Sequence, residues 1–448
     1  MRRIAVIGGG ISGLAAALRL QDIAAEQPEA LQISLYEPQD RLGGCIQTWR
    51  ENGFVLEGGA DSILADKPAG MRMLTRLGLA DRLCGMLPEF KGARIVHRGK
   101  LRRLPSHFRL FSPTSIAALV GSGLFSPAGV ARAAMEPLIP RRTSNEDESL
   151  GSFVRRRFGR EVLDRLAQPL LAGIYSADPE RLSMEATLPQ FRQMEQRYGS
   201  VMRAMRAAPQ ERKPPVLMSL PGGLGTLVEA IANELHSVER MHEAAPNLKT
   251  LRERYDAVIC AIPAYAAAEI VRETDAHLAA LLDRIHYNSI ATITLGYPVR
   301  AIPALPRTQG FIVPFVERRG IVAATIVSQK YPQRAPDGWA VLRVFCGGAL
   351  QPELVHQSDE QLEVLARKEL ADLLAIHAAP EFVRISRMFR VLPEYAVGHT
   401  TLVREIEQRA AALGGLALAG SAYHGVGIPD CIGSGEVAAE RLLGTSRR

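Results

Sequence analysis

Three glycines close to the N-terminus, Gly8, Gly10 and Gly13, stand in the spacing G-x-G-x-x-G. In a strand–turn–helix, the first such glycine permits a tight turn, the second lets the backbone approach a pyrophosphate, and the third lets helix and strand pack closely. The helix that follows presents free N–H groups and a partial positive charge to the phosphates. The spacing alone is weak evidence, because the chain has 39 glycines among 448 residues.

The segments around this motif are those that the chemistry requires. Residues 3–7 form a short apolar run that predicts a strand, residues 12–25 are rich in alanine and leucine and predict a helix, and residues 31–36 alternate like a second strand. Glu37 follows 24 residues after Gly13, where an acidic side chain accepts hydrogen bonds from the hydroxyls of an adenosine ribose. We therefore expect a β-α-β unit that binds an adenine dinucleotide.

Two further glycine-containing segments follow the second strand, residues 40–44 (DRLGG) and residues 57–62 (EGGADS). Glycines in such segments allow backbone N–H groups to reach phosphate and ring atoms, and Arg41 would add a cation near two phosphate charges. Both segments resemble the flavin-containing amine oxidase superfamily, in which they line the pyrophosphate and the flavin ring. The resemblance implies FAD rather than NAD as the cofactor.

The composition places these segments in a large globular protein. A chain of 448 residues predicts two or three domains. The five cysteines are scattered without a CxxC or Cys/His cluster, so we expect neither disulfides nor a metal site. Residues 91–160 hold 14 Lys/Arg against 4 Asp/Glu, within a chain of net charge +7. This excess favours an anionic partner, either a polycarboxylate substrate or an anionic membrane surface. Nucleic acid is not expected, because no nucleic-acid-binding signature accompanies the charge.

The remaining elements predict a helical region between two groups of strands. Residues 105–206 are mostly helical in pattern, and the polar residues 206–215 suggest a linker. Residues 110–135 are broken by Pro113 and Pro127, so no membrane-spanning helix of about 20 residues is expected. Beyond the linker, we predict helices at 225–235, 360–376 and 435–443. Strands are predicted at 257–262, 290–295, 311–316, 320–327, 340–345 and 416–419.

Because the strands that look nucleotide-binding occur early, in the middle and at the end, the fold class is α/β (α+β overall) with a discontinuous Rossmann-like domain. We expect an FAD-binding domain built from residues 1–66, 216–290 and 390–448. A mixed-sheet substrate domain is expected at residues 67–104 and 291–389, and an inserted helical region at residues 105–215.

Three segments narrow the resemblance. Residues 149–200 contain RRRFG, QPLLAGIYSADPERLSMEAT and EQRYGS in order, residues 393–399 read PEYAVGH, and residues 420–435 read GSAYHGVGIPDCIGSG. Together they resemble the porphyrinogen oxidases of haem synthesis, the group of protoporphyrinogen and coproporphyrinogen III oxidases, over nearly the whole chain. The segments 189–191 (PQF) and 195–196 (EQ) are more similar to the Gram-positive coproporphyrinogen form than to the mitochondrial form.

This resemblance implies an oxidoreductase that uses FAD and O2, and it assigns residues to roles. It implies a lysine near the substrate at Lys67, leaves the catalytic residue unknown, and favours packing roles for His399 and His424 over catalysis. Ser421 stands where the wider superfamily often has an acidic residue, and Thr400 where the mitochondrial enzymes have an aromatic one. The implied FAD-binding residues are Gly8, Gly10, Ile11, Ser12, Gly13, Glu37, Arg41, Gly43, Gly44, Gly58, Gly59, Ala60, Asp61, Ser62, Val238, Val426, Gly427 and Ile428.

Several alternatives remain open at this point. Coproporphyrinogen III is the expected substrate and protoporphyrinogen IX the nearest alternative. An amine oxidase, a carotenoid desaturase or a non-enzymatic FAD-bound scaffold are more distant. The resemblance implies a cytoplasmic enzyme whose helical region can touch the inner face of the membrane and whose product can be handed to the next haem-pathway enzyme. The sequence does not choose between monomer and homodimer.

Overall fold

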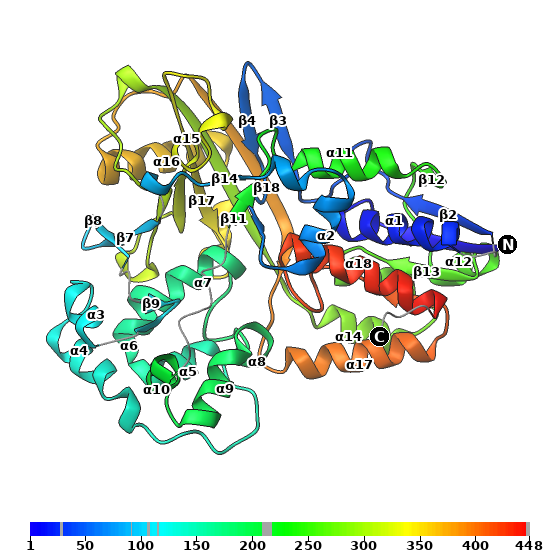
Figure 1. Cartoon of the computed structure of the whole chain (residues 1–448), viewed down its shortest axis with the longest axis horizontal. Helices are drawn as coiled ribbons and strands as arrows, with labels where there is room; N and C mark the ends of the chain where they lie inside the picture. The colour runs from blue at the N-terminus through cyan, green and yellow to red at the C-terminus, as the bar shows by residue number, and fades with distance from the viewer. Residues whose placement is uncertain (27–29, 91, 105–107, 114–115, 208–216, 445–448) are drawn as a thin grey trace.

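The computed structural model describes residues 1–26, 30–90, 92–104, 108–113, 116–207 and 217–444. Its elements fall into three regions: a parallel sheet covered by helices, a large mixed sheet, and a group of short helices (Figure 1). The first strand, β1 (Arg2–Ile7), and the last helix, α18 (Ile428–Leu443), both lie in the region of the parallel sheet (Figure 1).

The parallel sheet draws on three distant stretches of the chain. Its order is β12-β2-β1-β13-β19, and every neighbouring pair is parallel. Along the central strand, Ile4 and Val6 face one hydrophobic core while Ala5 and Ile7 face another. This alternation buries both faces, as a parallel sheet requires. The strands are β1 (Arg2–Ile7), β2 (Leu31–Tyr36), β12 (Val238–Met241), β13 (Ala257–Cys260) and β19 (Leu416–Leu418).

Helices cover the two faces of this sheet. On one face lie α1 (Ile11–Glu26), α2 (Pro68–Arg76), α11 (Gly225–Glu234) and α18 (Ile428–Leu443). On the other lie α12 (Leu248–Arg254), α13 (Ala264–Val271), α14 (Ala276–Asp283) and α17 (His399–Ala412). Helices α1 and α18 both begin at the carboxyl edge of the sheet, so their N-termini point to the same place.

The mixed sheet has seven strands in the order β18-β14-β17-β16-β15-β7-β8, antiparallel except where β15 meets β7. Helix α16 (Asp359–Leu374) covers one face and packs on Leu342 and Val344. Because side chains alternate along a strand, Arg343 and Phe345 lie on the opposite face. The strands are β7 (Ala93–His97), β8 (Lys100–Arg103), β14 (Tyr287–Pro298), β15 (Gly310–Ile312), β16 (Ala323–Ile326), β17 (Trp339–Gly347) and β18 (Phe382–Pro393).

Small elements join the two sheets. They are the hairpin β3 (Thr48–Glu51)–β4 (Phe54–Glu57), the short sheet of β5 (Ile63–Leu64), β11 (Leu217–Ser219) and β6 (Cys84–Gly85), and helix α15 (Val327–Lys330). A buried ion pair, in which Arg334 Nη1 lies 2.8 Å from Glu57 Oε1, ties β4 to the turn after α15.

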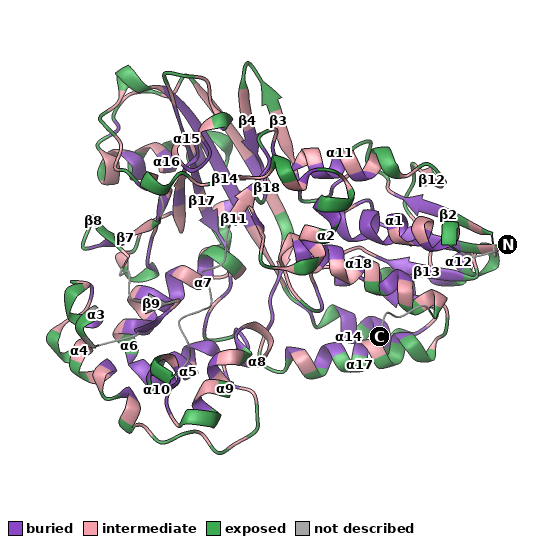
Figure 2. Cartoon of the chain, viewed as in Figure 1, coloured by how far each residue is buried: buried purple, intermediate pink, exposed green. Residues whose placement is uncertain are grey.

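The helical region has its own hydrophobic core, and Figure 2 marks buried residues along its helices. At its centre Arg157 is fully buried and forms an ion pair with Glu136, which also accepts from the backbone N–H of Val201 at 2.9 Å. The elements are the hairpin β9 (Phe108–Arg109)–β10 (Ser112–Pro113), α3 (Ile116–Gly121), α4 (Pro127–Ala134), α5 (Leu150–Phe158), α6 (Arg160–Val162), α7 (Gln168–Tyr175), α8 (Met184–Thr187), α9 (Pro189–Tyr198) and α10 (Val201–Ala207).

Several predicted elements differ from the structure, and among them the strand predicted at 320–327 spans only Ala323–Ile326. The strand predicted at 311–316 ends at Ile312, because Pro314 follows and a 3₁₀ turn occupies Phe315–Glu317. The last helix begins at Ile428 rather than at residue 435, and the region predicted as helical includes a β hairpin at 108–113. The predicted linker lies mostly outside the described residues. Within the described part of the chain, no helix is both long enough and apolar enough to cross a bilayer.

Candidate active site

The glycine turn after β1 lies at the carboxyl edge of the parallel sheet. Gly8 has φ +104°, a conformation that residues with side chains rarely adopt. A Cβ at Gly13 would lie 1.8 Å from the carbonyl oxygen of Gly8, so α1 approaches β1 closely only because residue 13 is glycine. A Cβ at Gly10 would meet nothing within 4 Å, so this glycine faces open space. The turn thus leaves room for a phosphate group beside the first N–H groups of α1.

Glu37 ends the second strand and holds the glycine turn. Its Oε2 accepts from the N–H of Gly9 at 2.9 Å, and its Oε1 accepts from the N–H of Gln39 at 3.0 Å. The backbone N–H of Glu37 donates to the carbonyl of Met241 at 3.0 Å, which links β2 to the end of β12. Glu37 lines the cavity described below, and each carboxylate oxygen retains capacity to accept a further hydrogen bond.

The loop after β2 packs directly on the glycine turn. The N–H of Gly43 donates to the carbonyl of Gly9 at 2.8 Å. A Cβ at Gly44 would lie 3.2 Å from the Cα of Gly10, so a larger residue would crowd the turn. Gly43 and Gly44 both line the cavity.

Arg41 contacts the backbone of its own loop. Its guanidinium donates to the carbonyls of Leu42, Gly44 and Ile46 at 3.2, 2.7 and 2.8 Å. Arg41 does not belong to the cavity lining, because these backbone acceptors hold it behind its own loop. It therefore shapes the loop that faces the cavity.

The loop 57–62 supplies a second wall. A Cβ at Gly58 would lie 2.7 Å from the ring of Trp49, so this glycine allows close packing and does not line the cavity. A Cβ at Gly59 would lie 2.2 Å from the carbonyl oxygen of Cys45, which brings the two glycine loops together. The residues of this loop that line the cavity are Gly59, Ala60, Asp61 and Ser62.

The C-terminal motif contributes the start of α18. Val426 and Ile428 line the cavity, whereas Gly427 caps the helix and donates its N–H to the carboxylate of Asp430 at 3.2 Å. The sequence predicted that this helix begins at residue 435, seven residues after its actual start at Ile428. The segment GIPDCIGSG is typical of a turn unless its helix cap is recognised. Pro429 in the first turn and Asp430 three residues after the cap are the signals that could have found it.

His399 packs behind this motif. Its ring stacks on Tyr395 with centroids 4.0 Å apart, and Tyr395 Oη donates to the carbonyl of Ser421 at 2.6 Å while accepting from the N–H of Gly425 at 2.7 Å. Burial lowers the pKa of His399 to about 4. His424 is exposed and pairs with Glu407 at 2.8 Å. Neither histidine lines the cavity.

Two predicted site residues lie away from the cavity lining. Lys67 Nζ lies 2.5 Å from Asp430 Oδ2, and its side chain is 41% exposed. Val238 begins β12, three residues before the carboxyl edge where Met241 meets Glu37. A strand rises about 3.3 Å per residue, so Val238 is roughly 10 Å from that edge.

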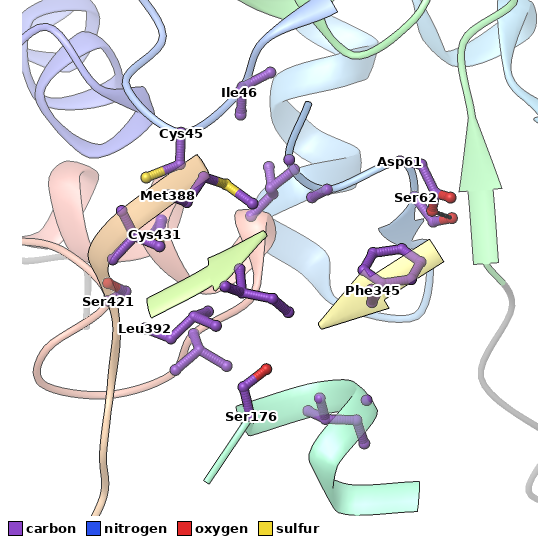
Figure 3. A pocket seen from close by; sticks show the side chains of 18 of the residues that line it. Cys45, Ile46, Asp61, Ser62, Ser176, Phe345, Met388, Leu392, Ser421 and Cys431 are labelled. Carbon is purple, nitrogen blue, oxygen red and sulfur yellow. Dashed lines mark hydrogen bonds between the residues drawn. The ribbon is translucent and has the colours of Figure 1, made fainter. Parts of the chain in front are cut away.

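One cavity of about 710 Å³ joins these loops to the other two regions. It runs from the glycine turn to a slot between α7 and the mixed sheet, and Figure 3 shows Asp61, Ser176, Phe345 and Leu392 around the same space. A cavity of this size suits a cofactor or substrate, for which about 300–1,000 Å³ is typical. The apolar walls of the slot include Ala172, Ile174, Phe311, Ile312, Ala323, Phe345, Met388, Val391 and Leu392.

A charged cluster interrupts this apolar wall. Asp61 Oδ1 lies 2.7 Å from Lys330 Nζ, and Asp61 Oδ2 lies 3.0 Å from Arg343 Nη2. Burial alone would raise the pKa of Asp61, but the two cations outweigh it and hold the pKa well below its ordinary value. Ser62 Oγ donates to Asp61 at 2.6 Å and shares a hydrogen bond with Tyr331 Oη at 2.8 Å. Asp61 is therefore ionised between two cations.

Sequence reasoning missed Lys330, Arg343 and the residues of α7. Arg343 is a single charge within the apolar run AVLRVF, and such an interruption is a signal of a polar face or site. Lys330 ends the short helix α15 that follows β16, and it belongs to no sequence motif. Its position at the cavity is therefore known only from the folded structure.

The arrangement defines a class. A parallel sheet with a glycine turn, sharing one cavity with a mixed sheet, is the architecture of a dinucleotide-dependent oxidoreductase. The chain belongs to the flavin containing amine oxidoreductase family, and the sequence model of that family matches residues 11–443. It is accordingly an FAD-dependent enzyme, and the open space at Gly10 beside α1 fits that cofactor.

Individual relatives are similar over nearly the whole length. The chain is 34% identical to the coproporphyrinogen III oxidase of Bacillus subtilis, covering 99% of this chain and 98% of the relative. It is 30% identical to that of Propionibacterium freudenreichii, covering 98% and 90%. A crystal structure from Exiguobacterium sp. 255-15, provisionally assigned as a protoporphyrinogen oxidase, superposes with a TM-score of 0.89 at 31% identity over 99% of both chains.

Proposed function

We propose that this chain oxidises coproporphyrinogen III to coproporphyrin III with O2 in haem biosynthesis. The observation that carries the proposal is the single cavity, in which an open glycine turn and an apolar slot are continuous. A porphyrinogen is a large apolar macrocycle, which suits a slot with few polar groups. The two bacterial relatives named coproporphyrinogen III oxidase support this substrate.

The reaction removes six electrons and six protons from the macrocycle, and three O2 become three H2O2. FAD supplies the redox chemistry when bound, while the protein binds, orients and shields the reactants. Arg343 Nη1 donates to the carbonyls of Glu57 and Gly59 at 2.8 and 3.0 Å, so it fixes the loop 57–62 against the mixed sheet. Phe345 and Leu392 belong to the apolar walls of the slot, and apolar walls of this kind disfavour water beside a bound substrate. Among the described residues that line the cavity there is no histidine, and we assign no general base.

For the cofactor, we propose direct contact by the cavity-lining members of the predicted set. These are Gly8, Gly10, Ile11, Ser12, Glu37, Gly43, Gly44, Gly59, Ala60, Asp61, Ser62, Val426 and Ile428. Gly13, Arg41, Gly58 and Gly427 support these loops from behind by packing or hydrogen bonds. For the adenine, the end of β12 at Met241 is better placed than Val238, because Met241 adjoins Glu37.

We propose the three-part division expected from the sequence, with FAD bound by residues 1–66, 216–290 and 390–448. Membership of the five-stranded sheet supports it, since β1, β2, β12, β13 and β19 all fall within these ranges. Strands β14 and β18 run across two of the boundaries, so the FAD and substrate parts are joined by continuous strands.

We also propose a cytoplasmic location with peripheral contact at the inner face of the membrane through the helical region. Exposed apolar side chains support it: Val120 is 64% exposed, Met135 50% and Leu138 75%, all within the basic segment. Flotation with anionic liposomes tests this contact, and Leu138→Ser should reduce the floated fraction if the proposal holds.

A direct comparison of substrates tests the proposed reaction. Coproporphyrinogen III should be oxidised aerobically much faster than protoporphyrinogen IX, as measured by the rise of porphyrin fluorescence with purified FAD-loaded protein. Equal or reversed rates would favour protoporphyrinogen IX oxidation, to which the Exiguobacterium structure is assigned. No oxidation of either substrate would contradict the proposal.

A further inference from the structure

The charged cluster of Asp61, Lys330 and Arg343 carries one more positive than negative charge. All three residues line the cavity, and their side chains are only 14%, 10% and 4% exposed. The neighbouring pair of Arg334 and Glu57 is balanced within itself. The wall of the slot therefore holds a net positive charge in surroundings of low dielectric.

The cations of this cluster also have hydrogen-bond donors to spare. An ammonium group has three N–H donors, and among the described residues Asp61 is the only acceptor that Lys330 Nζ contacts within hydrogen-bond distance. Arg343 uses its two Nη atoms on Asp61 and on the carbonyls of Glu57 and Gly59. Its Nε is buried without a partner in the described part of the chain. Arg343 is thus committed mainly to the loop, whereas two N–H donors of Lys330 have no acceptor among the residues that the structure describes.

A buried charge of this kind is costly unless an anion compensates it. Asp61 compensates only one of the two cations and holds Lys330 in place through the short contact at 2.7 Å. The cluster lies at the junction of the loop 57–62 with β17 and α15, and Phe345, two residues after Arg343 on β17, belongs to the apolar wall of the slot. None of the described side chains supplies a second anion to this cluster, so we expect that anion to enter the slot as part of a ligand.

We propose that Lys330 binds a propionate carboxylate of the porphyrinogen and that Asp61 positions the lysine for it; this rests on the proposed function. Coproporphyrinogen III carries four propionates, so the slot needs cationic partners within it as well as at its rim. Lys67, the lysine that the sequence favours for this role, pairs with Asp430 and does not line the cavity. A charge-assisted hydrogen bond from Lys330 makes the slot selective for an acid over its neutral ester.

The test compares an acid with its ester on FAD-loaded protein. Binding of coproporphyrin III and of its tetramethyl ester is measured by porphyrin fluorescence with wild type, Lys330→Met, Lys330→Arg and the matched control Lys67→Met. Lys330→Met should weaken binding of the tetra-acid by about tenfold or more and leave binding of the ester within about twofold. Lys330→Arg should retain most of the affinity for the acid, and Lys67→Met should change neither ligand.

Three results would overturn the proposal. They are an unchanged affinity of Lys330→Met for the acid, an equal loss for acid and ester, and a loss of FAD absorbance that Lys330→Arg restores. The last result would assign the lysine to the cofactor. Failure of the proposed function is distinguishable, because wild-type protein would then fail to prefer coproporphyrinogen III in the comparison of substrates, whatever the binding of the tetra-acid to the variants shows.

Discussion

Single residues control this site in two opposite ways. Gly10 acts through the side chain that it lacks, because a Cβ there would project into open space at the start of α1. Lys330 acts through the charge that it brings to an otherwise apolar slot. The first kind of residue is visible in a sequence motif, while the second depends on partners that lie 269 positions away in the case of Asp61.

The open space at Gly10 makes a direct prediction about the cofactor. Gly10→Val should fold, since a Cβ at this position meets no protein atom within 4 Å. It should purify without the absorbance bands of oxidised flavin, because the new side chain would project toward the expected phosphate position. The control is Gly121→Val, where a Cβ also meets nothing within 4 Å but lies outside the cavity lining. A yellow Gly10→Val protein would show that the diphosphate lies elsewhere.

His399 makes a prediction about pH. Burial lowers its folded pKa to about 4, while the unfolded value is about 6.5. As the pH falls, the unfolded chain therefore binds this proton before the folded chain does. The contribution of the neutral His399 to the free energy of unfolding is fully present above about pH 6.5 and is lost as the pH falls from about 6.5 toward 4. The loss at pH 5 is about 2 kcal/mol from this residue.

Replacement by phenylalanine keeps the stack on Tyr395 and removes the titrating group. His399→Phe should lose about 2 kcal/mol less than wild type between pH 7 and pH 5, as measured by urea unfolding at each pH. Parallel curves for the two proteins would show that His399 is protonated in the folded state. In that case the folded pKa of His399 is close to its ordinary value, and burial does not determine it.

At the scale of elements, the sequence predicts what is local and periodic. The β1–α1–β2 unit was predicted within one or two residues, because its apolar periods and its glycine turn are contiguous. The strand at 311–316 was wrong beyond Ile312, where Pro314 overrides an apolar run. The joint cavity could not be predicted, because α7, β17 and α15 meet only after folding and no spacing relates Ser176, Lys330 and Arg343.

The crossing of α1 and α18 provides the prediction at this scale. A Cβ at Gly435 would lie 2.1 Å from the carbonyl oxygen of Ser12, so Gly435→Ala must push the two helices apart. Both helices begin at the cofactor edge, and we expect a lower thermal midpoint together with weaker FAD binding. On the same helix, Gly433→Ala brings its Cβ 3.3 Å from the methyl of Ala69, a contact that a small shift relieves. This control should be close to wild type, and equal effects of the two variants would contradict close helix contact.

At the scale of the molecule, the fold redistributes the charge that the sequence concentrates. Residues 91–160 have a formal excess of +10. In the structure Arg155 pairs with Glu180 and Arg156 with Glu195, both of which lie outside that segment. The segment is therefore less positive in three dimensions than in sequence, and part of its charge stabilises the helical region instead of facing a partner.

The shared cavity predicts that FAD stabilises more than the parallel sheet. The chain has two tryptophans: Trp339 begins strand β17 of the mixed sheet, and Trp49 packs beside that sheet with Phe54 and Phe382. Because the cavity joins that sheet to the glycine turn, adding FAD to cofactor-free protein should raise the thermal midpoint seen by tryptophan fluorescence as well as that seen by circular dichroism. At an FAD concentration of 100 times Kd the stabilisation is about 2.7 kcal/mol. NAD⁺ at the same concentration is the control and should shift neither midpoint. A shift confined to circular dichroism would mean that the two sheets unfold independently and that the cofactor touches only one of them.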